Sequence, residues 1–463
     1  MPAISVTGAQ WGDEAKAKVA DAINDEADLV VKFQGGNNAG NTVVKEDGTK
    51  IVLHYLSTAA VKNKMSAIAA GVVLNPGALL EEIAAFDDVN LMIDPRTHII
   101  MPYHISMDMA QEHYRNEKAK AGNKGAMGAI GTTHKGIGPA YKDRKDRIGI
   151  TFHELVSGSK SLEEKIKQNF RLYKKVIENY FGFSMVVPQG GNFGASQQHY
   201  TEVEVIERTM EQGKKLRRYL NDVSEEVIAL LNKGKNVLFQ GSQGVMLDVD
   251  WGNYPKVTSS HPTPGTIPTS VGVPLNLLYN MENVGVMKAY LTKVGSGPVA
   301  TCLDAHCWPV DESRSEKEAL HIRAKGHEYG ATTKRPRRVG WLDLVQLNYA
   351  CKMSGLTQLA MTKLDVLEGL EEIKVAYAYE VNGQQTSQYR AWDLEWLANA
   401  RPIYATLKGF EEGEVSNAKN YYELPSSAKN LVSLVQGYTN VPVTLISTGP
   451  KASQTIFKGF KGF

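Results

Sequence analysis

Short apolar runs rich in β-branched residues recur along the chain, and they limit its possible folds more than any other feature. Between them lie segments whose apolar residues repeat at helical spacing. Runs of this kind suit strands that are buried on both faces, as in a mainly parallel sheet covered by helices. The sequence therefore predicts an α/β fold with a large central sheet. The predicted strands are 4–7, 29–33, 67–74, 236–240, 285–291, 358–362 and 441–447.

Two long amphipathic helices are predicted in the middle of the chain. In 161–181 and 203–233 apolar residues recur at helical spacing, with charged residues on the opposite face. The link at 182–200 is rich in Gly, Gln and Ser, which is typical of a loop. The loop could contact a partner or simply connect the helices, and the second interpretation is favoured. These segments predict a helical and loop excursion at about 155–235.

The charge balance excludes several classes of partner. The 463 residues carry 52 Lys plus Arg and 50 Asp plus Glu, so the formal net charge is only +2. Such a charge supplies no global field that would attract nucleic acid or a membrane, and any anion site must be local. No window approaches the roughly 18 apolar residues of a membrane span, and the N-terminus does not resemble a signal peptide. A cytoplasmic protein is expected, and length alone leaves the number of domains open.

The cysteines offer little chemistry. The chain has three cysteines, an odd number without CxxC spacing: Cys302, Cys307 and Cys351. A zinc site built from Cys302, His306 and Cys307 is the weaker interpretation, and three reduced thiols are expected instead.

The first predicted strand runs into a glycine-rich turn, GAQWGDEAKAK at 8–18, and a helical pattern follows. Such a turn directs backbone N–H groups and a helix N-terminus at one point, where a phosphate binds, and Lys16 and Lys18 would add positive charge. The GxxxxGK[ST] spacing of a Walker A motif is absent, so a simple tight turn is the alternative. Asp13 favours the functional interpretation, because a carboxylate beside phosphates is best explained as a magnesium ligand, a general base, or both.

Two further segments combine glycines with neutral donors. The segment QGGNNAGNT at 34–42 follows a predicted strand. Its glycines leave the backbone N–H groups accessible, and its amide side chains are neutral donors, so phosphate oxygens could approach it closely. A loop without function is the alternative there. IGTTHKGIGPAYKDRKDR at 130–147 joins Thr132 and Thr133 to glycines and a basic run. A solvated basic face would explain those charges but not the hydroxyl pair.

Two later segments supply charged recognition groups. GATTKRPRRVGWLD at 330–343 places two threonine hydroxyls ahead of three arginines, a dense group of donors for carboxylate or phosphate. TKLDVLEG at 362–369 follows a strand. In its Lys363-x-Asp365 arrangement, a carboxylate can accept from N1 and N2 of guanine while the lysine stem covers the ring. That short pattern has low specificity by itself.

Taken in order, these segments resemble adenylosuccinate synthetase along nearly the whole chain. GSQGVMLDVDWGNYPKVTSS at 241–260 and STGP at 447–450 belong to the same resemblance, which comprises seven ordered motifs. It implies one P-loop-related α/β domain over 1–463, a mostly parallel sheet flanked by helices, and a homodimer. It also implies a Mg²⁺-dependent ligase of purine biosynthesis, in which GTP phosphorylates the 6-oxygen of a purine monophosphate, with IMP favoured. The amine of L-aspartate then displaces phosphate.

The resemblance also assigns roles to residues. Asp13 would take the N1 proton of the purine and bind magnesium with the carbonyl of Gly40. Asn41, Gln243 and Lys16 would complete the catalytic group, with Lys16 at the γ-phosphate. The purine monophosphate would be bound by Asn38, Thr133, Gln243, Thr258 and Arg335 and by Arg147 of the other subunit; aspartate by Thr332, Thr333 and Arg335; and GTP by Gly12, Lys16, Gly40, Thr42, Arg337, Lys363, Asp365, Ser447 and Gly449.

Four positions depart from the family pattern, mainly on the triphosphate side. Ala15 and Ala17 stand where the family has glycine; an alanine at positive φ costs on the order of 1 kcal/mol, and its methyl could crowd a phosphate oxygen. Asn41 replaces a histidine, so it donates a neutral hydrogen bond but neither carries charge nor gives up a proton. Lys135 replaces an arginine and loses the bidentate fork.

Three interpretations remain open. The leading one is an active, slower ligase with the family reaction. The second is a specialised ligase that uses another purine monophosphate, of the dGMP or 2-aminopurine type, or ATP as donor. Viral relatives of the family that act on 2-aminopurine substrates lack the base that Asp13 supplies, so the retention of Asp13 argues against that version. The third is a catalytically silent nucleotide-binding regulator, which would have no use for a carboxylate beside phosphates.

Overall fold

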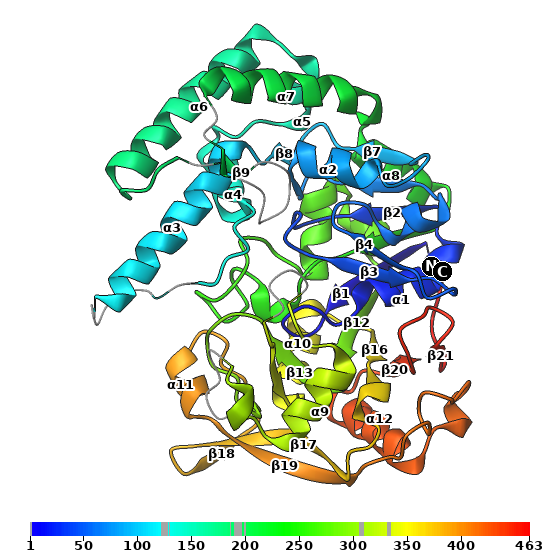
Figure 1. Cartoon of the computed structure of the whole chain (residues 1–463). Helices are drawn as coiled ribbons and strands as arrows, with labels where there is room; N and C mark the ends of the chain where they lie inside the picture. The colour runs from blue at the N-terminus through cyan, green and yellow to red at the C-terminus, as the bar shows by residue number, and fades with distance from the viewer. Residues whose placement is uncertain are drawn as a thin grey trace.

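A nine-stranded sheet forms the centre of the computed structural model, which describes residues 2–121, 128, 130–185, 187–188, 197–198, 201–304, 310–330 and 335–463 (Figure 1). The strand order is β21-β20-β16-β12-β1-β11-β2-β5-β7. All neighbours pair in parallel except β20 and β21. The strands are β1 (Ala3–Gly8), β2 (Leu29–Lys32), β5 (Ser66–Ile68), β7 (Leu91–Ile93), β11 (Val237–Gln240), β12 (Glu282–Lys288), β16 (Gln358–Thr362), β20 (Val443–Ser447) and β21 (Thr455–Phe457).

The predicted α/β class and parallel sheet are confirmed, with two corrections of extent. The predicted run 67–74 is divided between β5 and β6 (Val73–Leu74), because the chain turns where the Val72 N–H donates to the Ala69 carbonyl. The run 285–291 is divided between β12 and β13 (Leu291–Lys293), which leaves the sheet. The edge strands β7 and β21 were not predicted; each has three residues, too few to show a periodic pattern.

The sheet is buried on both faces, which explains its nearly continuous apolar strands. On one face, α1 (Lys16–Ile23) packs Val19 and Ala20 against β1, β2, β11 and β12. On the other, α8 (Val223–Asn232) packs Val223 and Val227 against the alternate residues of β2 and β11. Because successive side chains point to opposite faces, both sets of positions must be apolar.

The helical excursion forms the upper part of the molecule in Figure 1. The first predicted helix is α6 (Lys160–Asn179). The second prediction, one helix over 203–233, is wrong: the chain forms α7 (Glu202–Leu216) and α8, separated by a 3-10 turn. Asp222 begins α8 by accepting a hydrogen bond from the Glu225 N–H at 3.3 Å, which is typical of an N-cap. The neighbouring helices are α2 (Pro76–Ile83), α3 (Pro102–Lys120), α4 (Ile137–Asp146) and α5 (Phe152–Ser157).

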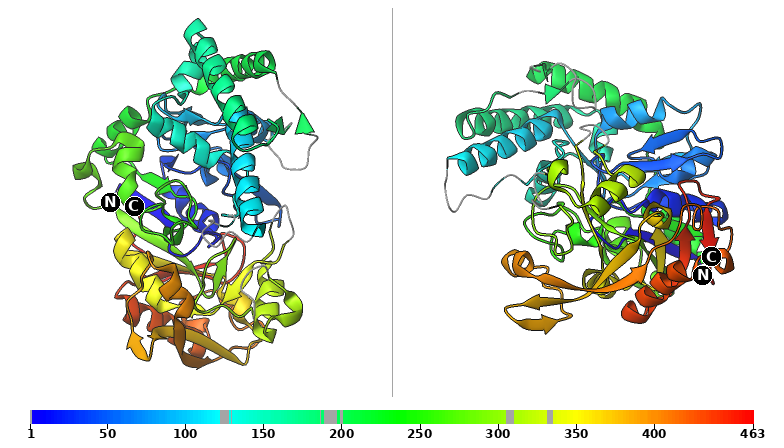
Figure 2. Two further views of the ribbon diagram at one scale, coloured as in Figure 1. Left: turned by 90° about the vertical axis from the view of Figure 1, so that its left-hand side faces the viewer. Right: turned by 60° about the horizontal axis from the view of Figure 1, so that its bottom comes forward.

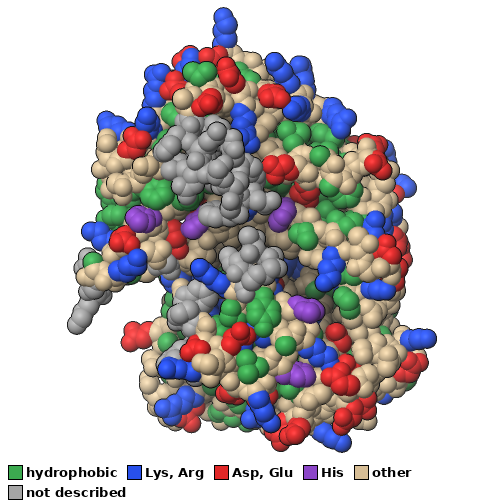
Figure 3. All heavy atoms as spheres, viewed as in Figure 1, with side chains coloured by type: hydrophobic (Ala, Val, Ile, Leu, Met, Phe, Trp, Pro, Cys, Tyr) green, Lys and Arg blue, Asp and Glu red, His purple; other side chains and the backbone are tan. Residues whose placement is uncertain are grey.

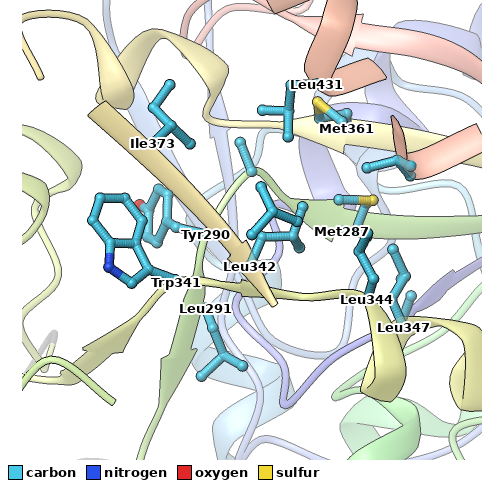
Figure 4. Packing of buried hydrophobic residues seen from close by; sticks show 14 of the residues in the cluster. Met287, Tyr290, Leu291, Trp341, Leu342, Leu344, Leu347, Met361, Ile373 and Leu431 are labelled. Atoms are coloured by element: carbon cyan, nitrogen blue, oxygen red, sulfur yellow. The ribbon is translucent and has the colours of Figure 1, made fainter. Parts of the chain in front are cut away.

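A second, smaller sheet lies in the lower part of Figure 1 and was not predicted. Its long strands β17 (Glu372–Val381) and β19 (Arg401–Lys408) are antiparallel, and β15 (Leu342–Asp343) and β18 (Gln384–Thr386) complete it. The largest apolar cluster of the described residues joins this sheet to β12 and β16 (Figure 4). The helices of this part are α9 (Lys317–Gly326), α10 (Leu344–Ser354), α11 (Leu394–Asn399) and α12 (Ser426–Thr439).

Short paired strands connect these parts. They are β3 (Asn41–Val44) with β4 (Lys50–Leu53), β6 with β8 (His98–Ile99), β9 (Val187–Pro188) with β10 (Gln197–Gln198), and β13 with β14 (Arg338–Gly340). The two chain ends lie side by side in both views of Figure 2. Acidic and basic side chains are interspersed on the face shown in Figure 3, as the small net charge suggests. Within the described ranges, no helix combines the length and apolar character needed to cross a bilayer.

Replacing Phe239 tests the central strand. Phe239 is fully buried in β11 between β1 and β2, so Phe239→Ala should lower the free energy of unfolding by about 3–5 kcal/mol in urea denaturation. Val52→Ala, at a position 53% exposed on β4, is the matched control and should change stability by less than about 0.5 kcal/mol. Equal losses in both variants would contradict this core.

Candidate active site

The turn between β1 and α1 has an unusual backbone. Gly12, Asp13 and Ala15 have φ angles of +90°, +61° and +62°, whereas Ala17 lies inside α1. The concern raised by the missing glycines therefore applies to Ala15 and not to Ala17. No side chain caps the N-terminus of α1, and its first turn contains no acidic residue. Its N–H groups and positive dipole end therefore suit an anion.

Glu14 holds this turn together, although its role was not predicted. Its carboxylate is fully buried and accepts from the N–H groups of Gln10 at 3.1 Å and Gly12 at 2.7 Å. The second oxygen accepts from Lys16 Nζ at 2.6 Å, so the lysine predicted to reach a phosphate is itself ion-paired. A buried carboxylate with three donors fixes the loop conformation without help from a ligand.

The turn interlocks with the segment that follows β11. A Cβ on Gly8 would lie 2.4 Å from the Gln243 carbonyl oxygen, and one on Gly244 would lie 2.4 Å from that of Gln10, so only glycine fits either position. Gln243 Nε2 then donates to Asn38 Oδ1 at 3.2 Å. The predicted residues Gly12, Gln243 and Asn38 are thereby brought to one place.

Asp13 is connected to the proposed nucleobase pocket by a chain of ion pairs. Its carboxylate is 40% exposed, and Arg337 Nη2 lies 3.0 Å from its Oδ2 atom. Arg337 Nη1 also contacts Glu328 Oε2 at 2.8 Å, and Lys363 Nζ contacts Glu328 Oε1 at 2.9 Å. Three residues predicted from separate motifs, Asp13, Arg337 and Lys363, are therefore joined through one carboxylate that sequence reasoning missed.

Glu328 is fully buried and has an exceptional set of donors. Lys288 Nζ and the Tyr290 hydroxyl approach its Oε1 atom to 2.8 Å and 2.6 Å, in addition to Lys363. Burial alone would raise the pKa of Glu328, but Lys288, Lys363 and Arg337 hold that pKa well below its usual value. The charged form of Glu328 is therefore favoured, and it contacts two of the predicted ligand-binding side chains, Lys363 and Arg337.

The predicted nucleobase pocket is assembled around Asp365. Its Oδ1 atom is buried and has no hydrogen-bond partner within the described residues, and burial raises the pKa of this carboxyl against the nearby charge of Lys18. Lys18 Nζ donates to the Ser447 hydroxyl and to the Gly449 carbonyl oxygen at 2.6 Å. Burial lowers the pKa of Lys18 to about 7. The fold brings Asp365, Ser447 and Gly449 close to the first turn of α1.

The segment 34–42 contributes an unsatisfied donor. Asn41 begins β3 and is 4% exposed, and its Nδ2 group has no acceptor in the described part of the chain. The strand β3 packs on α1, the helix that begins at Lys16. A buried N–H₂ group without a partner costs about 1–3 kcal/mol, which a ligand oxygen would recover. Gly40 and Thr42 flank Asn41 and are exposed.

Other predicted ligands lie outside this network. Thr133, Thr258 and Arg147 make no side-chain contact with it within the described residues, and Arg147 is exposed at the end of α4 with a φ of +63°. The Gly330 N–H donates to the Arg335 carbonyl at 2.9 Å. Thr332 and Thr333, between these two residues in the sequence, lie outside the described residues.

The cysteine prediction is partly wrong. Cys302 is disulfide-bonded, whereas Cys351 is a buried free thiol. His306 and Cys307 lie outside the described residues, and the remainder form no group of three or more His, Cys, Asp or Glu that could hold a metal.

The missed residues share one property. Glu14 and Glu328 are fully buried carboxylates paired with cations. Glu14 pairs with Lys16 of its own turn, whereas Glu328 pairs with Lys288 of the buried strand β12 and with Lys363 from distant segments. The available signal was an acidic residue directly beside a glycine-rich or arginine-rich motif. Such a residue repels a phosphate unless cations neutralise it.

The two alanines of the first turn should respond oppositely to glycine. Ala15→Gly relieves the left-handed conformation and should raise the free energy of unfolding by about 0.5–1 kcal/mol. Ala17→Gly, its matched control, places glycine inside α1 and should lower that free energy by about 1 kcal/mol. Urea denaturation measures both, and changes of the same sign would contradict the backbone described.

Comparison with known proteins agrees with this geometry. A family model described as Adenylosuccinate synthetase matches residues 5–456. The adenylosuccinate synthetase of Alkaliphilus metalliredigens is 38% identical, with 99% of each chain covered, and that of Clostridium botulinum strain Alaska E43 is 40% identical, with 98% of this chain and 99% of the relative covered.

Two solved structures extend the comparison. The fully ligated adenylosuccinate synthetase of Plasmodium falciparum has a TM-score of 0.84 at 31% identity, covering 99% of this chain and 100% of the other. A cyanophage S-2L succinoaminodeoxyadenylate synthetase, bound to dGMP and dATP, has a TM-score of 0.55 at 16% identity over 98% and 95%, which shows the fold alone. From its motifs, fold and relatives together, the chain belongs to the adenylosuccinate synthetase family.

Proposed function

We propose that the chain joins the 6-position of a purine monophosphate, IMP, to the amine of L-aspartate through a 6-phosphoryl intermediate, with GTP as the phosphoryl donor. The chain is a ligase of the adenylosuccinate synthetase family, and its function lies in purine biosynthesis. The observation that carries the proposal is the position of Asp13, in a strained turn with its carboxylate 40% exposed and anchored on one oxygen by Arg337. This placement suits a base that meets its substrate without moving.

Asp13 would begin the reaction by accepting the N1 proton of the 6-oxopurine. The electron pair released makes the 6-oxygen a nucleophile, which forms a bond to the γ-phosphorus while the bond to the β,γ-bridging oxygen of GTP breaks. The aspartate amine then attacks C6, the 6-phosphoryl group leaves as phosphate, and the amine loses a proton. Two easier substitutions replace one difficult displacement of oxygen.

The phosphoryl group would be bound between α1 and the β3 segment. The uncapped N-terminus of α1 offers backbone N–H groups, and the buried Asn41 Nδ2 group supplies a donor that has no acceptor within the described residues. Lys16 would contribute positive charge while Glu14 keeps it in position. Asn41 stabilises phosphoryl oxygens without supplying a proton, so this step loses the acid that a histidine would provide.

A Mg²⁺ ion fits the donors present. Asp13 offers one half-exposed carboxylate, and the exposed Gly40 offers a carbonyl oxygen, whereas the described residues form no closed group of acidic ligands. One carboxylate completed by substrate phosphates and water is the usual environment of Mg²⁺. The ion would neutralise charge on the transferring phosphoryl group.

One buried carboxylate oxygen supports the choice of the donor nucleotide. The buried Asp365 Oδ1 atom is an acceptor without a partner among the described residues, and guanine presents two adjacent N–H donors to such a carboxylate. Adenine has no matching pair, which supports GTP over ATP. Asn38, Gln243, Thr133, Thr258 and Arg335 would bind the purine monophosphate.

The remaining assignments belong to the same proposal. Thr332, Thr333 and Arg335 would bind the aspartate carboxylates. The chain would act as one domain over 1–463 and as a cytoplasmic homodimer, in which the exposed Arg147 reaches the phosphate in the partner's site. The two alternatives, another purine monophosphate or a silent regulator, become outcomes of the first test below.

The first test combines an activity assay with one substitution. Mixing the protein with Mg²⁺, GTP, IMP and aspartate should yield a product with the mass of adenylosuccinate. Asp13→Asn keeps the side-chain size but removes the base, and should lower kcat by about 10²–10⁴-fold. Product from dGMP or with ATP, and none from IMP with GTP, would favour the specialised ligase. No product from any purine monophosphate would leave only the silent interpretation.

The second test restores the missing acid. Asn41→His should raise kcat and leave the KM values for the three substrates nearly unchanged, because the gain is confined to phosphoryl transfer. Asn41→Gln, which has an amide but no titratable group, is the control and should not raise kcat. A rate that stays equal or falls in Asn41→His would show that this loop is built around asparagine.

A further inference from the structure

Two buried cations face each other across the β13–β14 pair, away from the Glu328 network. Lys293 ends β13, Arg338 begins β14, and the two residues are direct partners in the antiparallel register. Cross-strand partners project to the same face of a sheet. Lys293 is 2% exposed and Arg338 is fully buried.

The cations surround the glycine turn that follows β13. Arg338 Nη2 and Nη1 donate to the carbonyl oxygens of Gly295 and Gly297, both at 2.5 Å. A Cβ on Gly297 would lie 3.3 Å from Lys256 Cγ and 3.7 Å from Lys293 Cε. Both lysine stems therefore pack against one α-carbon, and Arg338 fixes the turn from the other side. Three cations therefore converge on a single turn.

No carboxylate of a described residue forms an ion pair with Lys293. Its Nζ atom makes no hydrogen bond or ion pair with any described residue. Burial lowers the pKa of Lys293, Arg338 and Lys256 lower it further, and the result is about 7. Lys288, equally buried in β12, shows the contrast, because its ammonium contacts Glu328 at 2.8 Å. A buried ammonium among cations costs folding free energy and is retained where an anion binds.

The turn lies next to segments already linked to substrate. A Cβ on Gly131 would lie 3.6 Å from the Gly295 α-carbon, and one on Gly295 would lie 3.6 Å from the Ile130 carbonyl oxygen. Thr133 is two residues beyond Gly131, and Thr258 is two residues beyond Lys256. The cationic turn thus adjoins the two segments that carry the threonines assigned above to the purine monophosphate.

We propose that Lys293, with Lys256 and Arg338 around the 295–297 turn, forms an anion subsite that binds an anionic group of a substrate of the ligase reaction. The group is a phosphate or a carboxylate, whose shared chemistry is a compact anion that accepts several charge-assisted hydrogen bonds. Its source is the purine monophosphate or the aspartate. The assignment rests on the proposed function, whereas the existence of the subsite does not.

Thermal unfolding of the full chain tests the subsite without turnover. Inorganic phosphate and succinate are titrated separately, against NaCl at matched ionic strength. In the wild type at least one anion should raise Tm by about 2 °C or more beyond NaCl. Lys293→Met should abolish that response, and its own Tm should equal or exceed that of the wild type, because one repelling cation is gone. Lys293→Arg, which keeps the charge, should retain the response.

The control is Lys352→Met, which removes an exposed lysine on α10 and should behave as the wild type. Steady-state kinetics then identify the source. If Lys293→Met raises the KM for purine monophosphate by about tenfold or more, the subsite binds the phosphate. If it raises the KM for aspartate by that factor, the subsite binds the carboxylate. The KM for the nucleotide donor should not change. An anion response equal to that of the wild type, or three KM values within about twofold, would overturn the proposal. If no purine monophosphate yields product, the proposed function fails while the Tm comparison still decides the subsite.

Discussion

The active site depends on one carboxylate that contacts no substrate in the proposed reaction. Glu328 is fully buried, and four donors from three separate segments converge on its two oxygens. Without this negative charge, Lys288, Lys363 and Arg337 would repel one another in a region of low dielectric. Removing one partner from such a group destabilises a protein by about 3–5 kcal/mol. Arg337, which is held by Glu328, also contacts Asp13, so the position of Asp13 depends on this balance of charge.

Glu14 performs the same task on a smaller scale. It satisfies two backbone N–H groups of the β1–α1 turn and one lysine, so residues with left-handed backbone angles stay in place before any ligand arrives. A phosphate site formed in this way loses little conformational entropy on binding. The two buried acids explain why cations can gather densely around the proposed triphosphate site in a chain whose net charge is +2.

The sequence allowed most of the central sheet to be predicted, because strands buried on both faces leave continuous apolar runs. The smaller sheet was missed for the complementary reason. β17 mixes buried and exposed positions, β19 has no fully buried residue, and both strands carry charged residues at or near their ends. The break between α7 and α8 was missed because apolar spacing continues through it, although Asn221 and Asp222 mark a helix start. Motifs that follow predicted strands indicated Asp13 and Lys363 as candidate site residues, but pairing through Glu328 joins residues too distant in sequence for any local pattern to reveal.

The place of β1 in the sheet has a consequence for synthesis of the chain. This strand is synthesised long before its two neighbours, β11 and β12, which begin at Val237 and Glu282. The apolar strand β1, at the centre of the sheet, therefore stays without its partner strands until β11 and β12 have been synthesised. Contacts of such long sequence separation form slowly and leave hydrophobic strands exposed to aggregation. We expect a nascent chain of this topology to depend on a chaperone that shields β1.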